Sequence, residues 1–154
     1  LVDITETNGT LYVVPRSHKL FTDERPMFAP WQHKVHVPRL EQEFVNLYPK
    51  AGDLVVYFDK TLHGSYKNET NETRPVFQGG VMHKDAEPYF TRYNPATNMV
   101  ESYAVDPDFF FRKEYMKTDI DPRYPLVKSV PYQPLHVSAE EVDAFFKVTD
   151  QVTA

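Results

Sequence analysis

The distribution of apolar and polar positions in the first half of the chain indicates short β-strands bounded by turns. Residues 44–48 alternate with a period of two and stop at Pro49, and residues 10–14 follow an Asn-Gly turn and stop at Pro15. Two further apolar runs, residues 54–58 and 74–82, have the same character, and Gly79-Gly80 suggests a bulge in the second. Several short strands with turns between them predict an all-β sandwich or jelly roll.

The pattern changes after Asp85, where the chain becomes rich in proline and aromatic residues and only weakly periodic. We expect an irregular extension here, packed onto the strands through residues 109–111 and Tyr115. One helix is predicted: Ser138 and Glu141 have the spacing of a capping box, which opens a helix that runs to about Val148. Its apolar face is expected to carry Val142, Phe145 and Phe146. We therefore divide the chain into a core of residues 1–85 and an extension of residues 86–154.

A long irregular segment, residues 19–39, interrupts the strand-rich half and contains three prolines and Trp31. Long loops of this kind are often functional lids. An ordinary proline-rich surface loop is an equally good interpretation.

Composition narrows the class of protein. The chain has 154 residues, 41% of them hydrophobic and 14% aromatic, which suits one folded domain with a core and excludes a disordered chain. The net charge is −5 with no basic block, so we expect no nucleic-acid partner. No apolar run approaches the ~20 residues of a membrane-spanning helix, so no membrane partner is expected. Cysteine is absent, which excludes disulfides and thiolate metal sites and suits a cytoplasmic location.

The residues that best suggest chemistry are His63, Ser65 and Arg74. The polar segment 68–73 between the two apolar runs is turn-forming, and a hairpin centred on Asn68 and Glu69 would place His63 opposite Arg74. Directly opposed residues share a face of the sheet, and Ser65 shares it with His63 because it lies two positions further on. An imidazole, a hydroxyl and a guanidinium on one face can hold a metal next to a carboxylate. Arg74 could instead be a surface arginine paired with Glu72.

Two segments resemble the phytanoyl-CoA dioxygenase family of iron(II)/2-oxoglutarate-dependent oxygenases. Residues 8–19, Asn-Gly-Thr-Leu-Tyr-Val-Val-Pro-Arg-Ser-His-Lys, are similar to the family's Asn-Gly-x-Leu … Pro-Gly-Ser-His segment. The second match is residues 51–58, Ala-Gly-Asp-Leu-Val-Val-Tyr-Phe, running into residues 62–65, Leu-His-Gly-Ser, with Asn68 and Arg74 after them. Together they cover about residues 1–80.

The resemblance implies a double-stranded β-helix (jelly roll) and a role for each candidate. His63 would be the distal iron ligand, Arg74 would hold the far carboxylate of 2-oxoglutarate, and Ser65 would hydrogen-bond to it. The expected activity is hydroxylation of a small organic substrate with iron(II) and 2-oxoglutarate as cofactors. No residue of this chain is assigned a catalytic role beyond these, and the substrate and oligomeric state are not readable.

Two departures from the family pattern qualify these expectations. Arg16 stands where the family commonly has glycine, which is expected to change only a loop. The family's proximal His-x-Asp pair precedes the Asn-Gly segment and is not found before Asn8. We therefore expect a fragment holding the C-terminal part of the oxygenase core in residues 1–85, incomplete at its N-terminus and inactive by itself.

The other histidines are weaker candidates. His83 and Asp85 have the His-x-carboxylate spacing and with His63 would complete a facial iron triad, but the family places that pair before the distal histidine. His33 and His36 have no carboxylate close in sequence and are expected at the surface. His136 is expected to be a surface or helix-capping residue.

Three alternatives stay open beside the dioxygenase. A halogenase of the same superfamily would differ in the missing proximal carboxylate. A non-catalytic jelly-roll binding module would need neither His63 nor Arg74. A cupin enzyme without 2-oxoglutarate would leave Arg74 without an assigned partner.

Overall fold

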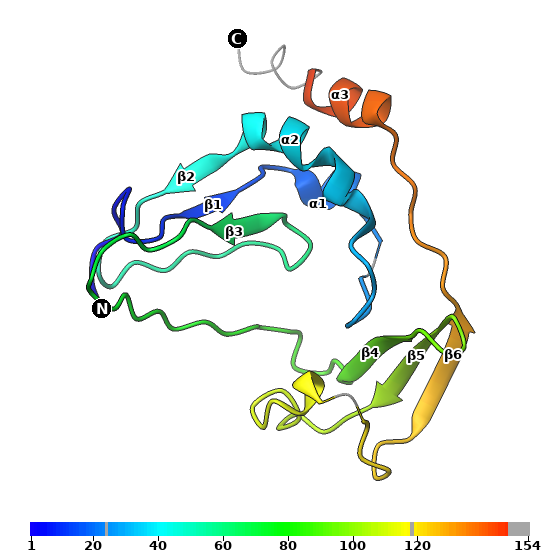
Figure 1. Cartoon of the computed structure of the whole chain (residues 1–154). Helices are drawn as coiled ribbons and strands as arrows, with labels where there is room; N and C mark the ends of the chain where they lie inside the picture. Colours follow the sequence, from blue (N-terminus) through cyan, green and yellow to red (C-terminus); the bar gives the residue numbers. More distant parts are fainter. Residues whose placement is uncertain (24, 118, 148–154) are drawn as a thin grey trace. The chain divides into compact units, whose positions relative to one another are not determined.

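The computed structural model describes residues 1–23, 25–117 and 119–147 as a β-rich chain with short helices (Figure 1). Two antiparallel three-stranded sheets have the strand orders β2-β1-β3 and β4-β5-β6. The elements follow one another as β1 (Leu11–Val13), α1 (Ser17–Leu20), a 3-10 helix (Gln32–His36), α2 (Val37–Leu40), a 3-10 helix (Glu41–Glu43), β2 (Val45–Leu47), β3 (His63–Ser65), β4 (Tyr89–Asn94), β5 (Met99–Ala104), a 3-10 helix (Glu114–Met116), β6 (Leu126–Pro131) and α3 (Ala139–Lys147).

The chain forms two compact units, and each takes residues from separate stretches of sequence. Unit 1 comprises Leu1–Asp23, Gln32–Gly79 and Leu135–Ala154, and unit 2 comprises Glu24–Trp31 and Gly80–Pro134. The expected division into an oxygenase core of residues 1–85 and an extension of residues 86–154 stays a prediction.

The sheet of unit 1 confirms two of the predicted strands. β1 lies in the centre and pairs antiparallel with β2 and β3, with Val13 opposite both Val45 and His63 and with Leu11 opposite Leu47 and Ser65. The register continues beyond the strands, because Asn8 forms an isolated antiparallel bridge with Asn68. His63 and Ser65 therefore share one face of this sheet with Leu11 and Val13.

Tyr12 covers part of the opposite face of this sheet. Its ring stacks on Phe44, with 4.1 Å between centroids and 13° between planes, and lies 5.0 Å from the ring of Tyr66. Gly64 is the strand partner of Tyr12, and a Cβ at this position would collide with the Tyr12 hydroxyl. Glycine between His63 and Ser65 is therefore required by the close approach of an aromatic side chain.

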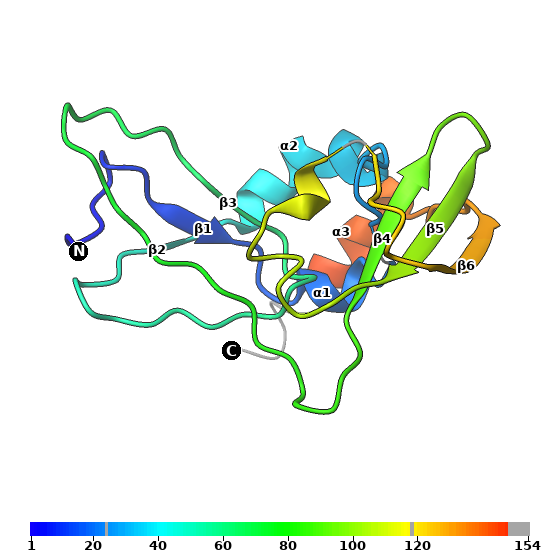
Figure 2. The same ribbon diagram turned by 90° about the horizontal axis from the view of Figure 1, so that it is seen from below.

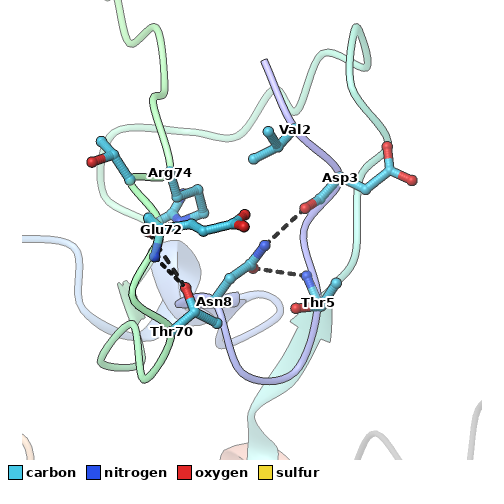
Figure 3. Close-up of a pocket in the computed structure, with 8 residues that line it drawn as sticks. Val2, Asp3, Thr5, Asn8, Thr70, Glu72 and Arg74 are labelled. Carbon is cyan, nitrogen blue, oxygen red and sulfur yellow. Dashed lines mark hydrogen bonds between the residues drawn. The ribbon is translucent and has the colours of Figure 1, made fainter.

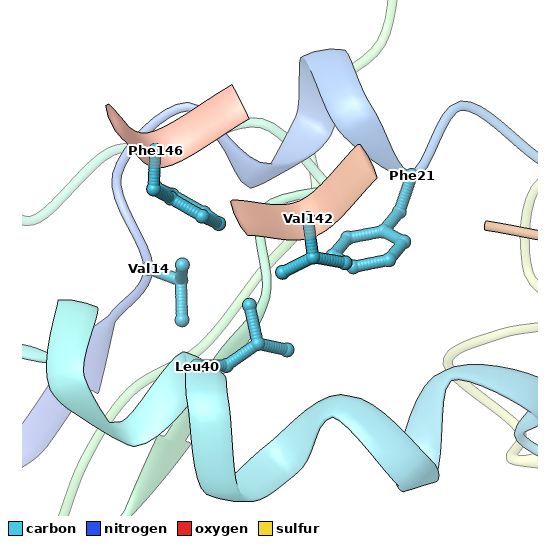
Figure 4. Close-up of a cluster of buried hydrophobic side chains, with 5 residues drawn as sticks. All are labelled: Val14, Phe21, Leu40, Val142 and Phe146. Carbon is cyan, nitrogen blue, oxygen red and sulfur yellow. The ribbon is translucent and has the colours of Figure 1, made fainter. Parts of the chain in front are cut away.

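The core of unit 1 joins the first strand to the last helix. Val14, Phe21, Leu40, Val142 and Phe146 are each at most 5% exposed and form one cluster (Figure 4). Figure 4 shows Val142 and Phe146 of α3 directed toward Leu40 and Val14. A helix from the end of the chain thus completes the core of the N-terminal strands.

The start and the buried face of α3 are as predicted. The Ser138 hydroxyl accepts a hydrogen bond from the Glu141 amide at 3.2 Å, and the Glu141 carboxylate accepts one from the Ser138 amide at 2.7 Å. This reciprocal pair is the capping box. Arg39 adds a link from α2, since its Nε donates to Asp143 at 2.6 Å and its guanidinium lies 5.6 Å from the Phe146 ring centroid. The predicted end at Val148 lies outside the described residues.

Two of the predicted strands are wrong. Residues 54–58 and 74–82 run as extended chain with no strand assigned (Figure 2), and Leu54, Val56 and Phe77 are 85%, 75% and 95% exposed. The apolar alternation identified these segments as strand-forming, but a strand also needs a neighbour for its backbone hydrogen bonds. The described residues therefore form two small sheets, and the closed jelly roll stays a prediction.

The segment expected to be irregular between residues 19 and 39 is helical in its second half. It contains the 3-10 helix Gln32–His36 and the start of α2, whose Leu40 is 2% exposed in the core. Pro38 is compatible with this helix because it stands in the first turn, where its missing N–H leaves no hydrogen bond unmade.

The C-terminal part is also more regular than expected, because β4, β5 and β6 lie within it. Met27 adds to the edge of β4: its amide donates to the Thr91 carbonyl at 2.9 Å and its carbonyl accepts from the Tyr93 amide at 2.8 Å. Phe109 packs in a core of unit 2 with Phe90, Val105 and Tyr124.

A buried carboxylate organises the loop between β5 and β6. Glu114 is 5% exposed, and its Oε1 accepts hydrogen bonds from Arg112 and Arg123, each at 2.6 Å. Arg112 also donates to Asp106, and the Tyr124 hydroxyl donates to Asp106 at 3.0 Å. The hydrogen bond from Arg112 is the main cause that lowers the pKa of Glu114, with Arg123 acting in the same direction against burial.

None of the helices in the described part of the chain has the length and apolar character needed to cross a bilayer.

Truncating Leu40 tests the core of unit 1. Leu40→Ala should lower the free energy of unfolding by about 3 kcal/mol, because it removes buried methyl groups and leaves a cavity. Leu54→Ala makes the same change at an 85% exposed position and should shift it by less than about 0.5 kcal/mol. Urea unfolding followed by circular dichroism measures both. Equal effects of the two variants would contradict the core described here.

Acid should weaken unit 2 through Glu114. A carboxylate whose pKa is lowered in the folded state stabilises that state above its unfolded pKa of about 4.3, and this contribution is lost as the pH falls toward the folded pKa. Glu114→Gln should therefore show a smaller loss of stability than the wild type between about pH 5 and pH 3. Glu69→Gln, at an exposed position in unit 1, is the control and should retain the wild-type profile. Amide hydrogen exchange in β5 and β6 is the measurement.

Candidate functional site

The sheet of unit 1 presents His63 at the start of β3. The imidazole Nδ1 lies 2.8 Å from the carbonyl oxygen of Thr61, and because a carbonyl only accepts, Nδ1 carries the proton. Nε2 of the neutral ring is then an unprotonated nitrogen with a free lone pair, which is the form that binds a metal. The ring of Tyr57 lies 4.7 Å from the imidazole and supports it from one side. The His63 residue as a whole is exposed.

Ser65 follows on the same face of β3 as His63 and is also exposed. Its partner across the ladder is Leu11. The sequence prediction that the imidazole and this hydroxyl share one face agrees with the register.

Arg74 lies on the chain after the 68–73 turn and packs against Gly9. A Cβ at Gly9 would stand 3.3 Å from both Nε and Nη2 of Arg74 and 3.2 Å from the Tyr66 carbonyl oxygen. Gly9 also has a φ of +90°, so glycine is required here both for the backbone conformation and for the approach of the guanidinium. Nε of Arg74 is buried and has no hydrogen-bond partner in the described structure.

A pocket of about 270 Å³ opens beside this guanidinium (Figure 3). Arg74 and Glu72 form one wall, Val2, Asp3 and Thr5 the other, and Asn8 lies between them. Both walls are fixed by side-chain amides. The amide of Asn8 accepts from the Thr5 N–H at 2.8 Å and donates to the Asp3 carbonyl at 2.9 Å, and the amide of Asn68 donates to the Glu72 carbonyl at 2.8 Å.

The charges around the pocket leave Arg74 without a carboxylate partner. Among the described residues, no salt bridge within 4.0 Å involves Arg74, so the expected alternative of a surface pair with Glu72 is not formed. Asp3 is engaged elsewhere: it accepts from the Ala51 amide at 2.8 Å and from Lys50 Nζ at 3.2 Å. The bond from Ala51, and then that from Lys50, lowers the pKa of Asp3.

The hairpin that would put His63 directly opposite Arg74 is wrong. His63 pairs with Val13 of β1, and Arg74 is not part of a strand. The guanidinium instead contacts Gly9. Gly9 lies four residues before Val13, and at 3.3 Å per residue the two positions are about 13 Å apart along the strand. Ser65, opposite Leu11, lies between these two positions along the ladder.

The described residues do not form a complete metal site. Residues 1–23, 25–117 and 119–147 contain no group of three or more His, Cys, Asp or Glu side chains placed to hold an ion. His83 and Asp85 are exposed, with 3.6 Å between Nδ1 and Oδ2, and belong to unit 2. His63 alone fits the expected role, as a single accessible imidazole.

The expectation that His33 and His36 are surface residues is wrong. They are 5% and 8% exposed, and the ring of His33 lies 4.4 Å from that of Phe21. His33 Nε2 lies 3.2 Å from Oδ1 of Asp23, and His36 Nε2 donates to the Val137 carbonyl at 2.8 Å. The prediction considered only carboxylates close in sequence, whereas Asp23 is 10 residues from His33 and Val137 is 101 residues from His36. Both histidines belong to the packing around the core.

Sequence reasoning missed the backbone groups that orient His63, among them the Thr61 carbonyl. It also treated Arg16 as a change in a loop alone. Arg16 has φ 65° and ψ 0°, the left-handed conformation that glycine adopts without strain, which explains why glycine suits this position. The Arg16 guanidinium lies 4.9 Å from the centroid of the Phe145 ring in α3.

No curated protein and no solved structure matches the chain. The family model described as phytanoyl-CoA dioxygenase (PhyH) matches residues 1–76, a stretch that contains His63, Ser65, Gly9 and Arg74. Residues 1–76 of the chain are thus similar to the phytanoyl-CoA dioxygenase family.

Proposed function

We propose that this chain carries the distal part of the active site of an iron(II)/2-oxoglutarate-dependent dioxygenase that hydroxylates a small organic substrate. The match of residues 1–76 to the phytanoyl-CoA dioxygenase family supports an enzyme of the oxygenase type. The finer assignment rests on His63, Ser65 and Arg74.

The observation that carries the proposal is the state of His63. The Thr61 carbonyl holds the proton on Nδ1, and Nε2 is left as the free nitrogen on an exposed face of the sheet. A hydrogen bond to the second ring nitrogen is the usual support of a metal-binding imidazole, because it fixes both the tautomer and the ring orientation. His63 is therefore assigned as an iron ligand.

Arg74 is assigned to the cosubstrate. A guanidinium binds a carboxylate through two parallel N–H···O hydrogen bonds, and the buried Nε of Arg74 has no such partner in the described structure. The pocket beside it has room for a small dicarboxylate, since a water molecule takes about 30 Å³. Ser65 lies along the ladder between His63 and Gly9 and would donate its hydroxyl to the same carboxylate.

Bound iron(II) with 2-oxoglutarate would supply the oxidative chemistry, and the protein's part is to hold and orient. A facial iron site takes two histidines and one carboxylate, of which the family pattern assigns only His63 to the residues after Asn8. The small-molecule substrate stays a prediction from the family resemblance. The absence of nucleic-acid and membrane partners and the cytoplasmic location stay predictions from composition.

The assignment of Arg74 predicts a loss of 2-oxoglutarate binding in Arg74→Lys. Lysine keeps the charge but not the two-pronged geometry, so the affinity should fall roughly 10- to 100-fold, as expected when charge-assisted hydrogen bonds are lost. Titration of the chain with 2-oxoglutarate, followed by the NMR signals of Gly9 and Arg74, measures it. Arg25→Lys makes the same change at an exposed position of unit 2 and should leave the affinity unchanged. Equal affinity in Arg74→Lys and the wild type would remove Arg74 from the site and favour a binding module or a cupin-type enzyme.

Because only one imidazole of this chain is assigned to the iron, we predict little catalysis by the chain itself. Supplied with iron(II), 2-oxoglutarate and oxygen, it should form no more succinate than His63→Ala. One protein ligand does not hold iron(II) in place against exchange with water, so 2-oxoglutarate is not oxidised at the site. Succinate measured by mass spectrometry decides the question. Turnover that exceeds the His63→Ala background would show that residues of this chain complete the iron site.

A further inference from the structure

Leu62, the residue directly before His63, is held from both sides by the turn that follows β1. Its carbonyl accepts a hydrogen bond from the Val14 amide at 2.8 Å, and its amide donates to the Ser17 hydroxyl at 2.7 Å. Ser17 is 0% exposed, so this hydroxyl is a fixed internal acceptor and not a solvent-exposed group. A buried backbone N–H without its acceptor is costly, which makes the link between Ser17 and Leu62 a strong constraint on the chain that enters β3.

The turn that provides this acceptor is itself rigid. The Ser17 amide donates to the Val14 carbonyl at 3.2 Å, and the Ser17 carbonyl accepts from the Phe21 amide at 2.9 Å at the start of α1. Val14 belongs to the core cluster with Val142 and Phe146, and Arg16 lies over Phe145, so α3 holds the turn from its other side.

The orientation of the His63 ring depends on this same stretch of backbone. Its Nδ1 donates to the carbonyl of Thr61, two residues earlier, and Leu62 is the residue that joins them. If the Leu62 peptide rotates, the Thr61 carbonyl turns relative to the imidazole and the hydrogen bond that selects the tautomer is lost.

We propose that Ser17 is a positioning residue for His63: its buried hydroxyl fixes the Leu62 amide and thereby holds the His63 imidazole with Nδ1 protonated and Nε2 free. The inference rests on the proposed function only in what the orientation serves, which is metal binding by Nε2. The orientation itself is a property of the metal-free chain.

The test is the tautomer of His63 in the metal-free full chain, read from long-range proton–nitrogen NMR correlations of the imidazole at a pH where the ring is neutral. The wild type should show protonated Nδ1. Ser17→Ala should shift the ring to a mixture of both tautomers, and the Leu62 amide should exchange with solvent roughly tenfold faster or more. Ser17→Thr keeps a hydroxyl at the same position and should return both signals toward the wild type.

Ser138→Ala is the matched control, because it also removes a hydroxyl that accepts from a backbone amide, but at the start of α3. It should lower thermal stability without moving the His63 tautomer. An unchanged tautomer in Ser17→Ala, or an equal shift in both variants, would overturn the proposal.

A measurement on the wild type covers the case of a variant that does not fold. If Ser17→Ala does not fold, exchange of the Leu62 amide in the wild type decides: protection comparable to that of the Val14 amide supports the link, and exchange at the rate of an open chain overturns it. None of these readouts depends on iron or 2-oxoglutarate, so a failure of the proposed function and a failure of this inference are distinguishable.

Discussion

The burial of Val142 and Phe146 against Val14, Phe21 and Leu40 is the interaction on which the rest of unit 1 depends. The strands of its sheet are three residues long, and such short ladders need a packed apolar cluster to be stable. The cluster is built from residues at both ends of the chain. Its apolar contacts add stability to a sheet whose short strands form few backbone hydrogen bonds. α3 is therefore part of the fold of the strands that carry the candidate site.

Hydrogen bonds of the backbone connect this core to the candidate site. Val14 is fixed by packing, Val14 and Ser17 together fix Leu62, and the segment from Thr61 to His63 then sets the direction of the imidazole. At the other end of the ladder, Gly9 makes room for the Arg74 guanidinium. The two groups that we propose to hold iron and 2-oxoglutarate are thus supported by separate parts of one β1–β3 ladder.

Unit 2 is organised by a different kind of interaction. Its core of Phe90, Val105, Phe109 and Tyr124 is accompanied by the buried Glu114 with its two arginine partners. A buried carboxylate is tolerable only when such hydrogen bonds compensate the loss of water. The family match ends at residue 76, so the larger part of this unit, residues 80–134, lies beyond it, whereas residues 24–31 lie within it.

The sequence by itself determined the local elements and the similarity of residues 1–76 to a known family. The strands around Leu11 and Asn46, the capping box at Ser138 and the apolar face of α3 follow from period, turn and cap signals that act within a few residues. The shared face of His63 and Ser65 follows from the alternation of a strand. Only the tertiary structure decided that residues 54–58 and 74–82 have no strand partners, that His33 and His36 are buried, and that Arg74 contacts Gly9 and not the position opposite His63. These outcomes depend on residues far apart in the chain, and the spacing of a motif carries no information about which distant backbone or side chain will be its neighbour.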